Sequence, residues 1–187
     1  MQKIYNYSLS MNNQLKEKCI FVMFTWRNLR SRKYISPYYF NNIFKLLKDD
    51  ELRLLLNKNN ITLYVSLHHN LLNNQNAFKR ISSIKYINQD GIFNCLMKCS
   101  LVVSDFSSVI FDIIYRKMPF IIYVPDSEDV NIKQLYDDDY YNTINGLKND
   151  SIYFENKFFR VDDTIKKIEF YINNKRHFSI YYIKYNR

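Results

Sequence analysis

At 187 residues, of which 47% are hydrophobic, the chain is long enough for one domain with a sizeable core and hardly for two. It has no apolar run of about 18 residues, the length that a membrane-spanning helix needs, and its N-terminus lacks the compact apolar segment of a secretory signal. The formal net charge of +9 favours anionic partners such as nucleotide phosphates, phosphate polymers, anionic membranes or nucleic acids, but the composition bias of A/T-rich coding explains it equally well.

The first predicted elements are a strand and a helix. Residues 1–18 are polar and aperiodic, which is typical of a lead-in or linker. The run "CIFVMFT" (19–25) is apolar throughout and predicts a strand buried on both faces. Ser36-Pro37 combines an N-cap residue with a proline at the first helical position, so we expect a helix to start there. Apolar residues at helical spacing carry this helix to Asn57, with a break near Asp49-Asp50.

The middle of the chain alternates between predicted strands and helices. These elements are a strand at 61–67, a strand at 84–87, a helix at 90–98, a strand at 101–104, a helix at 107–117 and a strand at 120–124. The residues expected to face the core from the two helices are Ile92, Phe93, Leu96 and Met97, and then Val109, Ile110, Ile113 and Ile114. This alternation predicts an α/β fold, with a Rossmann-like parallel sheet of about five strands and helices on both faces.

The C-terminal third has a weaker pattern. The segment after Val124 is acidic and polar and is expected to be mostly loop. A last helix is predicted over 162–174, with Ile165, Ile168 and Ile172 facing inward. The domain is therefore expected to span 19–175, followed by a basic, aromatic tail at 176–187. The odd, widely spaced cysteines (Cys19, Cys95 and Cys99) indicate reduced thiols, at least two of them buried, in a cytosolic protein.

Candidate site residues follow the predicted strands, because ligands of open parallel sheets bind beyond the carboxyl ends of the strands. Ser107 and Ser108 lie where a strand passes into a helix, so they either bind a phosphate at the helix N-terminus or one of them simply caps the helix. Glycine-rich phosphate loops are absent from this sequence, which contains two glycines in all.

The other candidates also have two interpretations each. Arg27 is a phosphate clamp or a surface charge, and His68 is a ligand group or a strand-end histidine bonded to backbone. Asp112 binds a ligand or bonds within the loop cluster, and Asp126 contacts a ribose or starts a turn. The acidic run 137–139 is expected to be a solvated loop, and no pattern of metal ligands appears.

The order of these motifs resembles the C-terminal part of the CDP-glycerol glycerophosphotransferase family, the teichoic-acid polymerases and primases of bacterial cell walls. The matching stretches are "FTWRNLR", "LHHN" and "VVSDFSSVIFDIIYRKMPFIIYVPDSED", and they cover roughly residues 19–130. The resemblance implies a GT-B arrangement of two Rossmann-like domains, of which this chain is similar to the one that holds the CDP-alcohol donor. It implies no cofactor and no metal.

The resemblance also assigns donor-binding roles to residues of this chain. By that resemblance, His68 is the histidine near the donor diphosphate and Ser107 and Ser108 are the phosphate-binding pair. The remaining matches are Thr25 and Arg27 of the TWR element, Asp105 and Asp112 flanking the serines, and Asp126. Two features of the motifs depart from the family: His69 replaces a proline, and an Arg-Gly segment is missing after Asp126. The N-terminal acceptor domain of the family is expected to be absent from this chain.

The expected activity is transfer of an alcohol phosphate from CDP-glycerol, or a related CDP-alcohol, to a glycerol-phosphate or glycan-lipid acceptor. The chain is expected to be slow or inactive by itself, with the general base supplied by a separate N-terminal domain or by His69. We expect it in the cytoplasm, with peripheral contact to the inner face of the membrane. The alternatives are a non-catalytic nucleotide-binding remnant and a basic module that binds membrane surfaces or nucleic acid; of the two surfaces, nucleic acid is the less expected partner.

Overall fold

The computed structural model describes residues 18–25, 37–67, 81, 84–105, 107, 109–116, 118–125, 157–158 and 160–174. In chain order, the elements are β1 (Cys19–Phe24), α2 (Pro37–Lys48), α3 (Asp50–Lys58), β2 (Thr62–Leu67), β3 (Ile84–Tyr86), the 3-10 helix η2 (Gln89–Gly91), α5 (Ile92–Lys98), β4 (Leu101–Ser104), α6 (Val109–Tyr115), β5 (Phe120–Tyr123), β6 (Lys157–Phe158) and α9 (Val161–Asn173). The five predicted strands are all present, and each is within one residue of its expected ends.

The strands form one parallel sheet in the order β3-β2-β1-β4-β5-β6. The chain first builds the sheet outward from β1 to β3, and then returns to the other side of β1 and builds outward from β4 to β6. The predicted Rossmann-like parallel sheet is therefore confirmed, and the strand order reverses between β1 and β4. The edge strand β6 was not predicted, because two residues are too few to show a periodicity.

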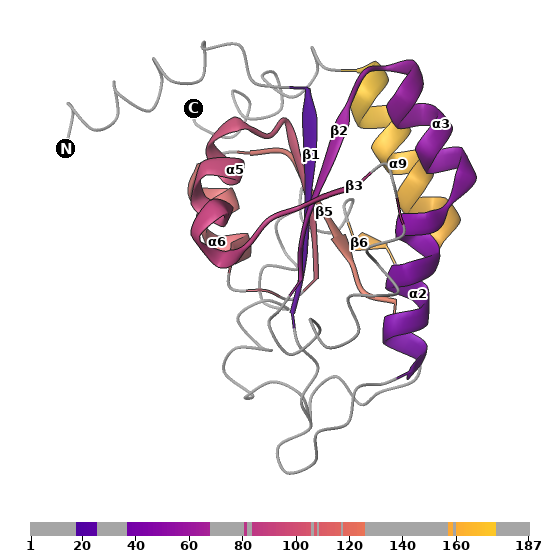
Figure 1. Cartoon of the computed structure of the whole chain (residues 1–187), viewed down its shortest axis with the longest axis horizontal. Coiled ribbons are helices and arrows are strands. Elements are labelled where there is room, and N and C mark those ends of the chain that lie inside the picture. Colours follow the sequence, from indigo (N-terminus) through magenta and orange to yellow (C-terminus); the bar gives the residue numbers. More distant parts are fainter. Residues whose placement is uncertain are drawn as a thin grey trace, which may run out of the picture.

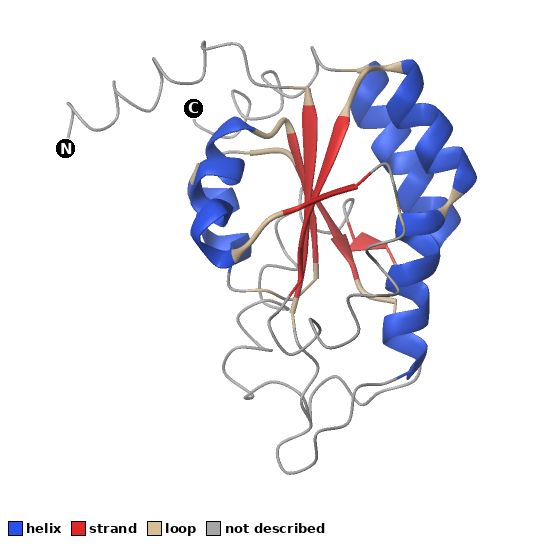
Figure 2. Cartoon of the chain, viewed as in Figure 1, coloured by secondary structure: helices blue, strands red, loops and turns tan. Residues whose placement is uncertain are grey.

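Helices cover both faces of the sheet, and each face has its own hydrophobic core. Figure 1 shows α5 and α6 on one side of the strands and α2, α3 and α9 on the other, and Figure 2 shows the same three layers by type of element. Strand β1 serves both cores, because Ile20, Val22 and Phe24 pack toward α2, α3 and α9, whereas Cys19 and Phe21 pack toward α5 and α6. This double burial explains why the first strand is an unbroken apolar run.

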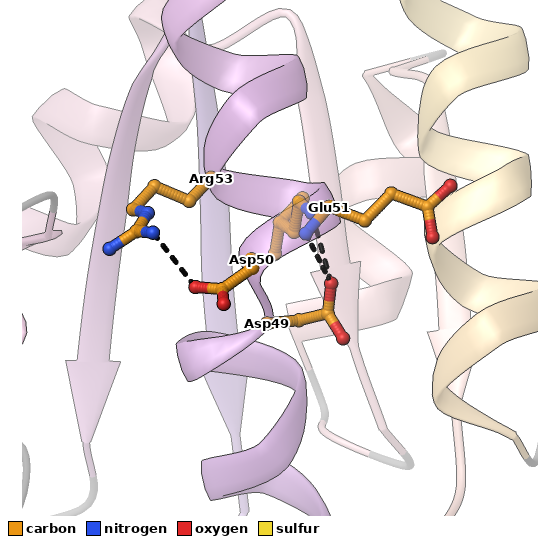
Figure 3. Close-up of polar contacts among 5 residues, drawn as sticks. Asp49, Asp50, Glu51 and Arg53 are labelled. Carbon is orange, nitrogen blue, oxygen red and sulfur yellow. Dashed lines mark hydrogen bonds and ion pairs between the residues drawn. The ribbon is translucent and has the colours of Figure 1, made fainter.

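The predicted break in the first helical segment lies at Asp49. This residue is extended (φ −60°, ψ 130°), so it ends α2 and begins α3. Its Oδ1 accepts hydrogen bonds from the amides of Glu51 at 2.9 Å and Leu52 at 3.1 Å, as Figure 3 shows. An aspartate at this position satisfies two of the amides that an α-helix leaves unpaired at its start. Helix α2 begins at Pro37 as expected, whereas the predicted cap, Ser36, lies outside the described residues.

The helices on the α5/α6 face differ in detail from the expectation. Phe93 was expected in the core but is 60% exposed, and Cys95 is buried instead, because η2 precedes α5 and helix α5 turns its Cys95–Leu96 side to the sheet. Helix α6 is shorter than the predicted 107–117, but its Val109, Ile110 and Ile113 are buried as expected. All three cysteines are buried and free, which confirms the expectation that at least two would be.

Helix α9 matches the last predicted helix within one residue at each end. Ile165 and Ile168 are buried as expected, Ile172 is half-buried, and Tyr171 joins them in the core. The lead-in up to residue 17, the segment 126–156 and the tail from residue 176 lie outside the described residues, so the predicted domain limits remain predictions. Among the helices that the structure describes, none has the length and apolar character needed to cross a membrane.

Candidate functional site

The candidate site lies at the carboxyl edge of β1 and β4, where the strand order reverses. Thr25 directly follows β1, and Asp105 directly follows β4. At the end of these strands, Met23 pairs with Ser104, and the Ser104 hydroxyl donates a hydrogen bond to the Met23 carbonyl at 2.7 Å. In open α/β sheets, this reversal opens the crevice in which ligands bind. The topology therefore brings together two of the motifs that are far apart in the sequence.

Thr25 and Asp105 contact each other directly. The Thr25 amide donates to Oδ1 of Asp105 at 3.0 Å and to Oδ2 at 3.2 Å, and the Thr25 hydroxyl donates to Oδ2 at 2.6 Å. The Asp105 side chain is 0% exposed. A buried carboxylate is tolerated only when donors replace the water that it has lost, and Thr25 supplies two of them.

Tyr39 supplies a third donor and was missed by the sequence analysis. Its hydroxyl, on the first turn of α2, donates to Oδ2 of Asp105 at 2.6 Å and lies 3.0 Å from the Thr25 carbonyl oxygen. The tyrosine is 0% exposed, and its ring belongs to the core on the α2 face. In the sequence, a tyrosine among apolar helical neighbours reads as a core residue, and nothing there indicates a partner 66 positions away.

Ser107 lies at the start of α6 and takes part in capping it. Its hydroxyl accepts a hydrogen bond from the Val109 amide at 3.4 Å, its carbonyl accepts one from the Ile110 amide at 3.0 Å, and it is 2% exposed. The structure thus contains the contacts that the capping interpretation predicts. Ser108 lies outside the described residues.

The other aspartate that flanks the serines is exposed, whereas Asp105 is buried. Asp112 is exposed in the first turn of α6, where a negative charge is favoured by the positive end of the helix dipole. The predicted site residues Arg27, His68 and Asp126 lie outside the described residues, as does His69. Within the described residues, no group of three or more His, Cys, Asp or Glu side chains could hold a metal ion.

Comparisons with known proteins agree with the motifs. The family described as "CDP-Glycerol:Poly(glycerophosphate) glycerophosphotransferase" matches residues 2–181. The chain is 26% identical over 172 residues to the "Minor teichoic acid biosynthesis protein GgaB" of Bacillus subtilis (strain 168). This match covers 81% of this chain and 19% of GgaB.

Two solved structures are also similar to the chain. The "Structure of the Wall Teichoic Acid Polymerase TagF" is 15% identical, with a TM-score of 0.45, and the match covers 92% of this chain and 41% of that one. A histidine-to-alanine variant of TagF is 16% identical, with a TM-score of 0.43, over 92% of this chain and 42% of the other. The chain thus spans about a fifth of GgaB and about two fifths of the TagF chains.

The family match extends well beyond the sequence motifs that carry the resemblance. Those stretches cover roughly residues 19–130, whereas the match runs from residue 2 to residue 181 and so takes in the last helix, α9, as well. The chain belongs to the CDP-glycerol:poly(glycerophosphate) glycerophosphotransferase family.

Proposed function

We propose that this chain binds CDP-glycerol, or a related CDP-alcohol, at the carboxyl edge of β1 and β4, as the donor-binding part of a teichoic-acid glycerophosphotransferase. The observation that carries the proposal is the meeting of Thr25 with Asp105, which belong to two family motifs 80 positions apart in the chain. The two residues meet at the strand reversal, which is where a parallel α/β sheet binds its nucleotide. Family membership supports a CDP-alcohol as that nucleotide.

In this proposal, the donor diphosphate is neutralised by Arg27, His68, Ser107 and Ser108. Charged and hydroxyl donors suit a diphosphate because hydrogen bonds to ionised groups are shorter and stronger than neutral ones. Asp112 and Asp126 complete the donor-binding set that the family motifs suggest.

The proposed reaction transfers an alcohol phosphate. An acceptor hydroxyl attacks the β-phosphorus of the donor and releases its proton to a base or to water. The bond from that phosphorus to the bridging oxygen breaks, and CMP leaves with the bridging oxygen. The contribution of the residues assigned here is to position the diphosphate and to stabilise the charge that develops on it. We assign no general base within the chain, so donor binding rather than turnover is the direct test.

Calorimetric titration of the full chain with CDP-glycerol, CDP-ribitol, CDP and CMP tests the proposal. We expect CDP and the CDP-alcohols to bind more tightly than CMP, because the β-phosphate adds contacts to the diphosphate site. Equal affinity for CDP and CMP, or no binding of either, would contradict a diphosphate site. If CDP-glycerol binds but no CMP is released in the presence of a glycerol-phosphate acceptor, a donor-binding role without independent turnover is favoured.

A pair of serine variants tests the assignment of the phosphate site. Replacing Ser107 and Ser108 with alanine is expected to weaken CDP binding by about 1.5–3 kcal/mol for each hydrogen bond to the charged diphosphate that is lost. The loss of a cap lowers the free energy of unfolding by only about 1 kcal/mol. Ser100→Ala is the matched control, because the Ser100 hydroxyl donates to the Cys19 carbonyl at 2.9 Å at the opposite edge of the sheet. If the double variant binds CDP as tightly as the parent, the serines act only as caps.

A further inference from the structure

The buried carboxylate of Asp105 joins three parts of the fold that are distant in the sequence. Thr25 follows β1, Asp105 follows β4, and Tyr39 belongs to α2, and all three meet at Oδ2 of Asp105. The Tyr39 hydroxyl has one proton and two acceptors within reach. The contact with the carboxylate, at 2.6 Å, is shorter than the 3.0 Å contact with the Thr25 carbonyl, and it is charge-assisted, so it dominates.

We propose that Asp105 and Tyr39 are positioning residues, which hold the segment after β1 against the segment after β4, and that the Asp105 carboxylate does not itself contact the donor. The hydrogen bonds of the carboxylate support this role. Its Oδ1 accepts the Thr25 amide, and its Oδ2 already accepts the Thr25 amide, the Thr25 hydroxyl and the Tyr39 hydroxyl. A carboxylate pointed at a diphosphate would also repel it, because both groups are negatively charged.

This arrangement has a consequence for donor binding. Arg27 follows Thr25 by two residues in the sequence, and Ser107 follows Asp105 by two. The hydrogen bonds between Thr25 and the Asp105 carboxylate, called the tie below, therefore fix the positions at which both segments begin. These two segments carry the proposed phosphate-binding residues. Loss of the tie is expected to lower the affinity for the donor although no residue that contacts the donor is removed. This expectation about donor affinity rests on the proposed function.

The first test measures the tie without any ligand. Amide hydrogen exchange of the full chain is followed by NMR in the parent and in Tyr39→Phe, Asp105→Asn and Tyr171→Phe. The Thr25 amide is expected to exchange about tenfold faster or more in the first two variants, while the amides of Phe21 and Val22 in β1 keep their protection. Tyr39→Phe keeps the ring that fills the core, so it remains informative even if Asp105→Asn does not fold.

Tyr171→Phe is the matched control. Tyr171 is also a buried tyrosine, 6% exposed, and its hydroxyl donates to the Phe120 carbonyl at 3.3 Å, at the start of β5 and thus at the opposite edge of the sheet. Loss of its hydroxyl is expected to leave both Thr25 exchange and CDP affinity unchanged. If Tyr171→Phe accelerates Thr25 exchange as much as Tyr39→Phe does, the effect is global loosening and the positioning role is wrong.

The second test measures CDP affinity in a double-variant cycle. Tyr39→Phe and Asp105→Asn are each expected to raise the Kd about 2- to 30-fold, the range of residues that act on a ligand without touching it. Because both substitutions act through the same hydrogen bonds, the Kd of the double variant for CDP is expected to be no higher than that of the single variant with the higher Kd. Thr25→Val, which loses the hydroxyl, is expected to behave like Tyr39→Phe, whereas Thr25→Ser keeps the hydroxyl and stays close to the parent.

The outcomes separate this inference from the proposed function. If the parent does not bind CDP, the proposed function fails, and the positioning role is then decided by Thr25 exchange alone. If CDP binds and the effects of the Tyr39 and Asp105 variants multiply in the double variant, Asp105 contacts the ligand independently and the inference is overturned. Unchanged Thr25 exchange in Tyr39→Phe also overturns it.

Discussion

The start of α3 offers a comparison between two neighbouring aspartates with the same charge and different contacts. Asp49 accepts two backbone amides through Oδ1, whereas Asp50 forms an ion pair with Arg53 at 2.9 Å in which the side chains are 79% and 52% exposed (Figure 3). Asp49→Ala removes a helix cap, and Asp50→Ala removes a solvated ion pair. We therefore expect their effects on stability to differ clearly.

The magnitudes follow from these contacts. Loss of an N-cap costs about 1 kcal/mol, in a range of about 0.5–2, and loss of a negative charge at the helix start costs about 0.3–1 kcal/mol more. Asp49→Ala is thus expected to lower the free energy of unfolding by about 0.8–3 kcal/mol. Asp50→Ala loses the same charge and an exposed ion pair worth about 0–1 kcal/mol, but alanine regains up to about 0.7 kcal/mol of helix propensity, so its net effect is small.

Denaturant and thermal unfolding of Asp49→Ala, Asp49→Asn and Asp50→Ala measure these differences. For a chain of this size, about 1 kcal/mol corresponds to a Tm change of about 2–4 °C. Asn caps a helix as well as Asp does, so Asp49→Asn is expected to retain most of the stability that Asp49→Ala loses. If Asp50→Ala costs as much as Asp49→Ala, or if Asp49→Asn costs as much as Asp49→Ala, charge rather than capping holds this helix start and the reasoning is refuted.

Two further predictions concern the core and the alkaline range. Leu96→Ala truncates a buried side chain and is expected to lower the free energy of unfolding by about 2–5 kcal/mol. Phe93→Ala loses an exposed stacking contact with Arg116 and is expected to lower it by about 0.5–1 kcal/mol. Equal losses for the two variants in denaturant unfolding would contradict the orientation of α5. Partial burial of Tyr86, which is 38% exposed, raises its pKa from the ordinary 10.0 to about 12. The stability linked to its neutral form is therefore complete below pH 10 and declines between pH 10 and about 12. Tyr86→Phe is expected to lessen the alkaline decline of the unfolding midpoint, and identical declines in the two proteins would speak against this linkage.

The sequence by itself indicated five of the six strands that the structure describes and the edge of the sheet at which the site residues were expected. Apolar runs such as "CIFVMFT" predict strands because a strand buried on both faces needs apolar side chains at every position. The break between the two helices at Asp49 can be predicted because helix capping depends only on a side chain and the backbone two or three residues away. The resemblance to the family assigned Thr25 and Asp105 to the site, and both follow buried strands, whose carboxyl ends share one edge of a parallel sheet.

Only the tertiary structure decided how these elements meet. The position of β4 beside β1, and hence the contact between Thr25 and Asp105, depends on the strand order, which no local pattern specifies. Tyr39 joins that contact because α2 packs on the face where it can reach the edge, and Phe93 turns outward because Cys95 and Leu96 fill the side of α5 that meets the sheet. These outcomes depend on packing between residues distant in the chain, and local periodicity carries no information about such partners.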